Sequence, residues 1–402
     1  MTTKCLAMAA IAASHFHRLR LVSIACIAAF LFAADASLAS AEPAGKHEFE
    51  FINVADSTQG YTNFEPFPAI NNKSAVVFVA TRSDTGQGVF RSRDGKVTTI
   101  ASGRDGLVGF DNAPVINRRG VVAFSAKTNS GSTAIFTDDG RSRTLIADSK
   151  INGLFGRGMG SPSINASGTV AFSAVLSVAG LPAGVSIFTG QGGDLNTVLS
   201  TSGSDFVSFL NVAINDAGKI VFSGARSDGS LGIFTLRKGL KTIVDTNAHP
   251  EFSGFGDPVI NNGGTIADVA FLILDGLNDG LEIISGKAGA IIPRTDPDGP
   301  AFANAEHPSI NNHGAVAFYA FPNLDPNEPT GIFLEVSGGN ALIPVIRPGD
   351  ALFGSTVSAV DLGRFALNDR FEAVFQYALT DGRTGIAIAA FHGKKEDDDQ
   401  DE

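Results

Sequence analysis

The 402-residue chain has no tryptophan and almost no cysteine. Its two cysteines, Cys5 and Cys26, both lie within the first 41 residues. Because we expect those 41 residues to be removed, the mature chain would hold neither a disulfide framework nor a reactive thiolate. Beyond residue 41, no apolar run approaches the roughly 20 residues that a membrane-spanning helix needs.

The N-terminal segment has the features of a secretory signal peptide. Arg18 and Arg20 precede an apolar stretch of 14 residues, Leu21 to Ala34, and Ala39-Ser40-Ala41 forms an A-x-A cleavage site. An uncleaved membrane anchor is the alternative, but this stretch is too short to span a bilayer. We therefore expect a secreted or periplasmic protein with three parts: a signal peptide (1–41), a folded domain (42–392) and an acidic disordered tail (393–402).

Basic charge is also scarce. The chain has 30 Lys and Arg against 41 Asp and Glu, a net charge of −11. Removing residues 1–41 takes away three basic residues and one acidic residue, which brings the net charge to −13. Such a chain repels phosphate backbones, so we expect no nucleic-acid partner. The abundance of Gly (46) and Phe (31) instead indicates many tight turns between short, half-buried strands.

A repeat of about fifty residues fills the rest of the chain. Its clearest copy, PVINRRGVVAFSA, runs from Pro114 to Ala126. An Asn preceded by Ile or Leu recurs seven times, Gly follows three residues later in five copies, and Phe follows seven residues later in six. In the fifth copy we expect an insertion that delays the Phe to Phe271. The seven anchors are Asn71, Asn117, Asn165, Asn215, Asn261, Asn311 and Asn368.

Each copy is typical of four short strands. The first ends at the Ile-Asn pair, the Val-Ala-Phe run forms the second, an Ile-Phe pair such as Ile135-Phe136 the third, and a β-branched run such as Thr242-Ile243-Val244 the fourth. The Asn-x-x-Gly spacing predicts a tight hairpin turn, because Asn bonds its own backbone and Gly accepts positive φ. We prefer this interpretation to the alternative, in which the seven Asn form a ring of ligands.

The two ends of the repeat array predict a closed ring. The last copy lacks a fourth strand, whereas the first copy is preceded by an extra alternating segment, Phe49 to Ile52. An N-terminal strand that completes the last blade would remove both free edges, and an open β-solenoid would not need this offset. The sequence therefore predicts an all-β fold: a seven-bladed β-propeller of four-stranded antiparallel blades, closed by the N-terminal strand.

In its repeat motif the chain resembles uncharacterised secreted bacterial proteins with tandem I-N-x-x-G-x-V-A-F…G-I-F repeats. The resemblance covers nearly the whole mature chain and implies a propeller-like secreted repeat protein. It implies no catalytic residues. The fifth copy departs most from the pattern, with Glu282-Ile283-Ile284 where other copies carry Gly-Ile-Phe.

Candidate metal ligands are few. Among the five histidines after residue 41, only His307 and His313 are close in sequence, and their spacing is unusual for zinc. Two Asp-Gly loops, Asp275 to Gly280 and Asp296 to Gly299, offer oxygen ligands that would suit calcium, although Asp-Gly is also a common turn. We expect no other cofactor and leave the metal ligands unassigned.

No catalytic residues are predicted. There is no nucleophile elbow, and the glycine-rich stretch Gly153 to Gly160 lacks a phosphate-loop ending, so we interpret it as a connection between blades. We expect a monomeric, non-enzymatic binding or scaffolding module with a protein or carbohydrate ligand. The alternative is a secreted lyase or glycosidase with its site at the central channel mouth. Long loops on one face carry Asp84, Asp228, Asp275, Asp279, Asp325 and Asp381, which would make that mouth acidic. The alternative, which we prefer, is that these are solvated loop residues of a generally acidic protein.

Overall fold

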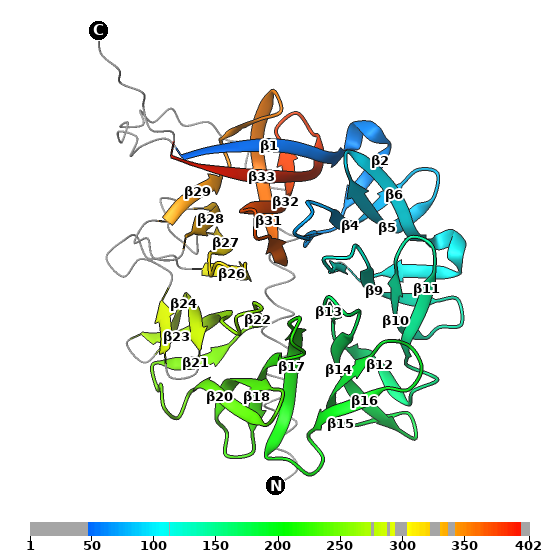
Figure 1. Cartoon of the computed structure of the whole chain (residues 1–402), viewed down its shortest axis with the longest axis vertical. Helices are drawn as coiled ribbons and strands as arrows, with labels where there is room; N and C mark the ends of the chain where they lie inside the picture. Colours follow the sequence, from blue (N-terminus) through cyan, green and yellow to red (C-terminus); the bar gives the residue numbers. More distant parts are fainter. Residues whose placement is uncertain are drawn as a thin grey trace. The chain divides into compact units, whose positions relative to one another are not determined.

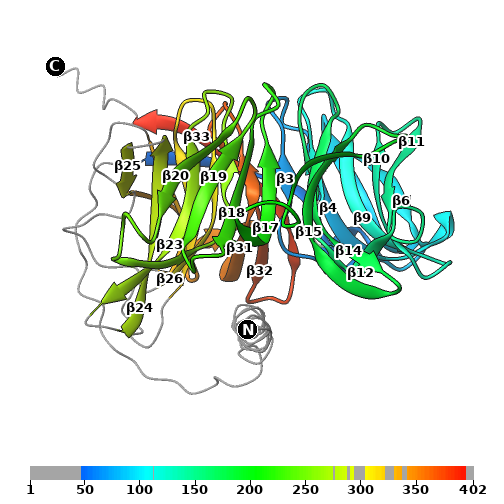
Figure 2. The ribbon, with the colours of Figure 1, turned by 90° about the horizontal axis from the view of Figure 1, so that it is seen from below.

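Seven antiparallel sheets stand as blades around a common axis (Figures 1 and 2), which confirms the predicted seven-bladed propeller. The computed structural model describes residues 47–394 except 112, 275–276, 288–289, 294–303, 322–329 and 337–341. The helices within these ranges are two three-residue 3-10 turns, η2 (Ser57–Gln59) and η3 (Gly103–Asp105). Across the described residues, no helix is long and apolar enough to cross a membrane.

The innermost strands surround the axis. Proline three residues before the anchor Asn removes a backbone donor, and it divides these strands into two pieces in blades 1, 2, 3 and 5. From blade 1 to blade 7 they are β2 (Tyr61–Phe64) with β3 (Ala69–Ile70), β7 (Leu107–Phe110) with β8 (Val115–Ile116), β12 (Leu154–Met159) with β13 (Ser163–Ile164), β17 (Phe206–Ile214), β21 (Phe252–Phe255) with β22 (Val259–Ile260), β26 (Asn304–Ile310) and β31 (Ser355–Leu367).

Three further strands complete each blade. The second strands are β4 (Val76–Arg82), β9 (Val122–Thr128), β14 (Val170–Val178), β18 (Ile220–Arg226), β23 (Ile266–Leu274), β27 (Val316–Phe321) and β32 (Glu372–Leu379). The third strands are β5 (Gly86–Arg93), β10 (Thr133–Asp138), β15 (Leu181–Gly190), β19 (Leu231–Leu236), β24 (Leu277–Lys287), β28 (Gly331–Glu335) and β33 (Thr384–Lys394). The outer strands are β6 (Lys96–Ser102), β11 (Arg143–Asp148), β16 (Asn196–Ser200), β20 (Leu240–Asp245), β25 (Ala290–Pro293), β29 (Leu342–Ile346) and β1 (His47–Asp56), and β30 (Ala351–Leu352) pairs with β31.

The core lies between neighbouring blades. Second strands have a blade on either side, so their Val-Ala-Phe runs are buried continuously rather than at alternate positions. In blades 1, 2, 3, 4 and 6 the Phe of this run packs on a Phe of the third strand, as in Phe124–Phe136 (ring centroids 5.6 Å apart) and Phe172–Phe188 (5.6 Å). In blade 7 the third strand has Ala387 at this position, and Phe51 of the closing strand contacts Phe375 instead.

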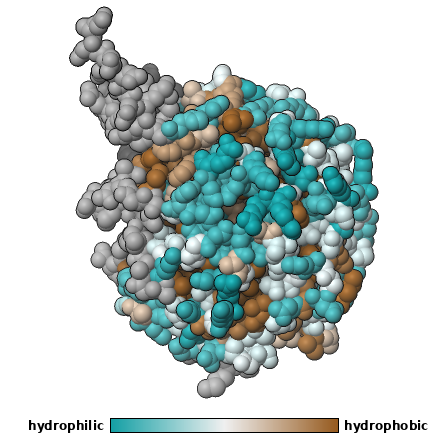
Figure 3. Space-filling view, in the orientation of Figure 1, coloured by the Kyte–Doolittle hydropathy of each residue, from teal (hydrophilic) through white to brown (hydrophobic). Residues whose placement is uncertain are grey.

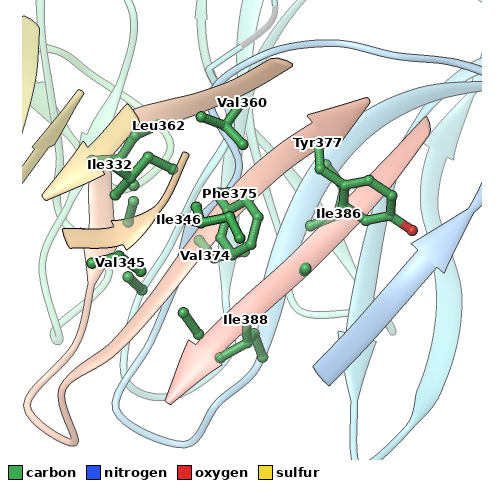
Figure 4. Packing of buried hydrophobic residues seen from close by; sticks show 14 of the residues in the cluster. Ile332, Val345, Ile346, Val360, Leu362, Val374, Phe375, Tyr377, Ile386 and Ile388 are labelled. Carbon is green, nitrogen blue, oxygen red and sulfur yellow. The ribbon is translucent and has the colours of Figure 1, made fainter. Parts of the chain in front are cut away.

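The N-terminal strand closes the ring, as predicted. β1 pairs antiparallel with β33 and forms the outer strand of blade 7 (Figure 1), with Phe49 opposite Phe391 and Phe51 opposite Ala389. Phe49 and Phe51 pack against the hydrophobic cluster shared by blades 6, 7 and 1, part of which is shown in Figure 4. Ile52, which we had grouped with them, is exposed because it points to the other side of the strand.

Two local predictions were wrong. The fifth repeat has no insertion before its second strand, because Val259 pairs with Ala267 in the register that joins Val115 to Ala123. Asp268 therefore occupies the position that Phe124 holds in blade 2. The glycine-rich stretch near Gly153 contains strand β12 rather than being wholly a connection.

Candidate functional site

The anchor asparagines form the turn between the first and second strands, as predicted. In blade 2, Asn117 Oδ1 accepts hydrogen bonds from the backbone N–H groups of Arg119 and Val121, both at 3.0 Å. Gly120 follows with φ of 87°, a value that glycine adopts without strain. Asn117 is buried, as are its six counterparts, so the side chains do not form an open ring of ligands.

The same asparagines also join neighbouring blades. Asn117 Nδ2 donates to the backbone oxygen of Asn165 at 2.9 Å, and the equivalent bond occurs at six of the seven junctions. One of these bonds, from Asn368 to Asn71, crosses the ring closure. At the remaining junction within the described chain, Ala166 N donates instead to Asp216 Oδ1. The repeat spacing revealed the turn but not this second role.

Phe365 lies at the axis of the ring. It replaces the proline found three residues before the anchor Asn in five other blades. Between the pairs Leu362–Phe375 and Leu367–Ala373, four residues of β31 oppose a single residue of β32, so this segment bulges. The Phe365 ring packs against the inter-blade clusters of blades 1–2, 2–3, 4–5 and 5–6, which places it across the centre of the propeller.

A second polar ring lies on the other side of Phe365 from the anchor asparagines. Each blade has a polar residue in its innermost strand or just after the first piece of that strand, four to seven residues before its anchor Asn. Five of the seven are acids. We call this set the inner collar: Glu65, Asp111, Ser161, Asn211, Asp257, Glu306 and Asp361.

Two pairs of neighbouring collar residues are hydrogen-bonded to each other. Asn211 Nδ2 donates to Asp257 Oδ2 at 2.9 Å, and Ser161 Oγ donates to Asp111 Oδ2 at 3.3 Å. Glu65 Oε1 instead accepts from Gln87 Nε2 of β5, outside the collar, at 3.2 Å. In the described part of the chain, none of the five collar carboxylates forms an ion pair with Lys or Arg. The collar therefore concentrates acidic side chains at one end of the axis.

The acids of blades 6 and 7 have perturbed proton affinities. Burial, followed by the charge of nearby Glu306, raises the pKa of Asp361 from 3.8 to about 7, although the N–H of Leu362 bonds its carboxylate. Burial also raises the pKa of Glu306. The pKa of Tyr319 rises to about 12 because of burial and then the charges of Asp361 and Glu306. Near neutral pH this part of the collar can exchange a proton.

Asp268 lies beside the collar between blades 4 and 5. It is fully buried in place of a core Phe, and the Ser223 hydroxyl lies 3.4 Å from its carboxylate. Burial, and then the charge of Asp257, raises its pKa well above the usual value, while Arg364 acts in the opposite direction. Arg364 extends from blade 7 to the backbone oxygen of Pro258 at 2.6 Å. One chain segment thus brings both Phe365 and this guanidinium to the axis.

Three of the loop acids singled out from the sequence have partners in nearby loops or strands rather than in the collar. Asp84 pairs with Arg82 at 3.1 Å, Asp381 pairs with Arg383 at 2.7 Å, and Asp228 accepts from Ser230 and Asn247. Asp275 and Asp325 lie outside the described residues, and Asp279 lies in β24 with its side chain not described. The inner collar was missed because its offset from the anchor Asn varies from blade to blade.

The proposed metal ligands are not brought together where they are described. The His307 ring lies 4.5 Å from that of Phe67, whereas His313 stacks on Phe371 at 5.3 Å. Among the described residues, no three His, Cys, Asp or Glu side chains are placed to hold a metal ion. The second calcium loop, Asp296 to Gly299, lies outside the described residues, as does part of the first.

Fold and site together define a closed, seven-bladed propeller with an acidic inner ring. Residues 53–391 match the model of a family of unknown function, DUF7453, and the chain belongs to that family. No curated protein matches the chain.

Solved structures support the fold. The β-propeller domain of the Trilobed protease from Pyrococcus furiosus, described as having an open velcro topology, matches with a TM-score of 0.52 at 12% identity, over 84% of this chain and 98% of that one. A prolyl endopeptidase matches with a TM-score of 0.54 at 12% identity, over 82% of this chain. This chain spans half the length of that enzyme. At such low identity the similarity concerns the fold alone.

Proposed function

We propose that this protein is an extracytoplasmic binding module whose inner collar holds a cationic group of its ligand. The observation that supports the proposal is the gathering of five carboxylates at one end of the axis without a Lys or Arg counter-ion in the described residues. A ligand ammonium or guanidinium would supply a counter-charge to these carboxylates. Arg364, the guanidinium that blade 7 brings to the axis, is itself bonded to the backbone oxygen of Pro258. A basic segment of a protein partner fits this chemistry.

The extracytoplasmic part of the proposal rests on the A-x-A site at Ala39-Ser40-Ala41. Mass spectrometry of the protein from its native host would then give a chain that starts near Glu42. A chain that starts at Met1 would contradict it.

Binding of a Lys-rich peptide, measured by calorimetry, tests the role of the collar. We expect the wild type to bind this peptide and not a neutral Gly-Ser peptide of equal length. The double variant Asp111→Asn/Asp257→Asn should weaken binding at least about tenfold, because each lost charge-assisted contact contributes more than about 1 kcal/mol.

The matched control is Asp84→Asn/Asp228→Asn, which removes the same charge from acids outside the collar. It should change the affinity less than about twofold, since exposed charges are screened by salt. Equal weakening by the two double variants would show that net charge, rather than the collar, attracts the peptide, and would contradict the proposal.

The pair Glu306 and Asp361 favours an enzyme as the second candidate. Two interacting carboxyls, one with a pKa of about 7, can share the roles of general acid and general base. Turnover of a panel of glycosides and uronate polymers would support this function if Asp361→Asn abolished it and left peptide binding intact. No turnover by the wild type would leave the binding module as the function supported.

A further inference from the structure

Four cationic side chains meet in a pocket at the anchor-asparagine end of blades 1 and 2. Lys73, Arg91, Arg93 and Arg119 line it, and Asn71 and Gly120 complete its wall. The chain as a whole carries a net charge of −11, so a pocket with four cations is a local reversal of charge. Hydrophilic residues cover much of the centre of the face seen in Figure 3.

Two of the guanidiniums are held in place by the neighbouring blade. Arg91 Nη1, on β5 of blade 1, donates to the backbone oxygens of Gly120 (2.7 Å) and Asp139 (3.0 Å) in blade 2. Arg119 Nη2, in blade 2, donates to the backbone oxygen of Ser167 (2.9 Å) in blade 3. These bonds fix the guanidiniums, so a ligand would not have to order them.

Glycines in the turns make room for these arginines. A Cβ atom at Gly140 would lie 2.6 Å from a nitrogen of Arg91, and one at Gly168 would lie 3.2 Å from a nitrogen of Arg119. Both glycines also have positive φ, 89° and 93°. The turns therefore accommodate the two guanidiniums as well as reversing the chain.

The other two cations have little compensation. Lys73 is exposed and has no acidic partner among the described residues. Arg93 pairs only with its neighbour Asp94 at 3.3 Å, and both side chains are largely exposed, at 59% and 82%. An ion pair so accessible to water is worth little. The four cations therefore repel one another, and an anion between them would relieve this repulsion.

We propose that this pocket is a binding site for an oxyanion of the phosphate or sulfate type. Guanidiniums present pairs of N–H donors that match such oxygens, and Lys73 adds a mobile point charge. The site lies at the opposite end of the inner strands from the collar and takes a ligand of opposite charge. Its ligand can be a free oxyanion or the phosphate of a lipid headgroup.

Titration with inorganic phosphate and with sulfate tests the proposal, at an ionic strength held constant with sodium chloride. We expect both anions to raise the melting temperature of the full mature chain above the value in chloride alone. The variant Lys73→Gln/Arg93→Gln should weaken the affinity measured by calorimetry about tenfold or more, because it removes the two cations that are not bonded to a neighbouring blade. Its own melting temperature without phosphate should match the wild type.

Arg237→Gln/Lys238→Gln is the matched control, since these exposed cations lie in the β19–β20 turn of blade 4. It should keep the response to phosphate. A second experiment measures binding to vesicles with and without phosphatidylserine. Binding to both free phosphate and anionic vesicles would show that the site also accepts the phosphate of a lipid headgroup. No response beyond chloride, or equal loss in the two double variants, would overturn the proposal. Binding to vesicles without binding to inorganic phosphate would overturn it as well.

Discussion

The two ends of the innermost strands differ in how strictly the repeats specify them. At one end the same residue, Asn, occurs in all seven blades, and it makes the same bond to the next blade at six junctions. At the other end the inner collar carries four residue types at varying offsets. Every blade must dock on its neighbour in the same way, whereas the collar residues need only present polar atoms to the axis.

The two ends also differ in the form of their polar groups. The asparagine amides are neutral, and burial costs them little once their donors and acceptors are bonded. The collar carboxylates lack counter-ions, and burial raises the pKa of Asp361 and Glu306. A fold does not need this arrangement for stability, so we take the anchor end as the structural end and the collar end as the end adapted to a ligand.

Removing the closing strand should disrupt both ends, and it is the largest effect that we expect. Deletion of residues 42–52 removes Phe49 and Phe51 from the core of blade 7 and frees the edge of β33. Loss of this half-buried aromatic surface and its strand pairing should cost about 3–5 kcal/mol and lower the melting temperature by about 10 °C. Differential scanning calorimetry would measure it.

Deletion of residues 395–402 is the control, because every described pair between β1 and β33 remains: the last is His47 with Lys394. Its melting temperature should equal that of the mature chain. An equal effect of both deletions, or none from the first, would contradict the role of β1 in closure.

A smaller loss of stability should distinguish the contribution of the inter-blade hydrogen bond from that of the turn. Asn117→Asp keeps the Oδ1 acceptor for the turn but removes the donor to Asn165 O and sets a carboxylate against that carbonyl. Asn165→Asp introduces the same buried charge at the junction where no such donor bond occurs in the described residues. We expect Asn117→Asp to lose about 1–3 kcal/mol more than Asn165→Asp in urea denaturation. Equal losses would mean that the inter-blade bonds add nothing to stability.

The sequence predicted the structural end well and the collar poorly, for physical reasons. Turn chemistry depends on residues close in sequence, so Asn-x-x-Gly and its spacing were enough to count the blades. The strand missing from the last copy and the extra segment before the first then placed the closing strand. The bond from Asn117 to the next blade and the position of Phe365 depend on contacts between distant repeats. Asp268 is visible in the sequence as an acid seven residues after Asn261, at the position where the repeat has Phe. We had explained the missing Phe by an insertion, and the strand register shows that there is none.

The smallest effect, and the one that tests the collar directly, is the pH dependence of Asp361→Asn. The pKa of Asp361 is raised in the folded protein to about 7 from 3.8, so the folded state holds more protons than the unfolded state between these values. The contribution of Asp361 to stability should therefore fall as pH rises from about 4 to about 7. Asn keeps an acceptor for Leu362 N and cannot ionise, so the variant should lack this slope.

We expect Asp361→Asn to match the wild type at pH 4 and to exceed its free energy of unfolding by about 1 kcal/mol at pH 8, because the half-buried carboxyl retains part of its hydration. Asp228→Asn provides the opposite sign: hydrogen bonds from Ser230 lower the pKa of Asp228, so its carboxylate stabilises the fold above pH 4 and its loss should reduce stability at pH 8. Urea denaturation at the two pH values distinguishes them. If both variants lost stability at pH 8, the collar acids would be held as favourably as a loop acid, and the distinction between the two ends of the inner strands would fail.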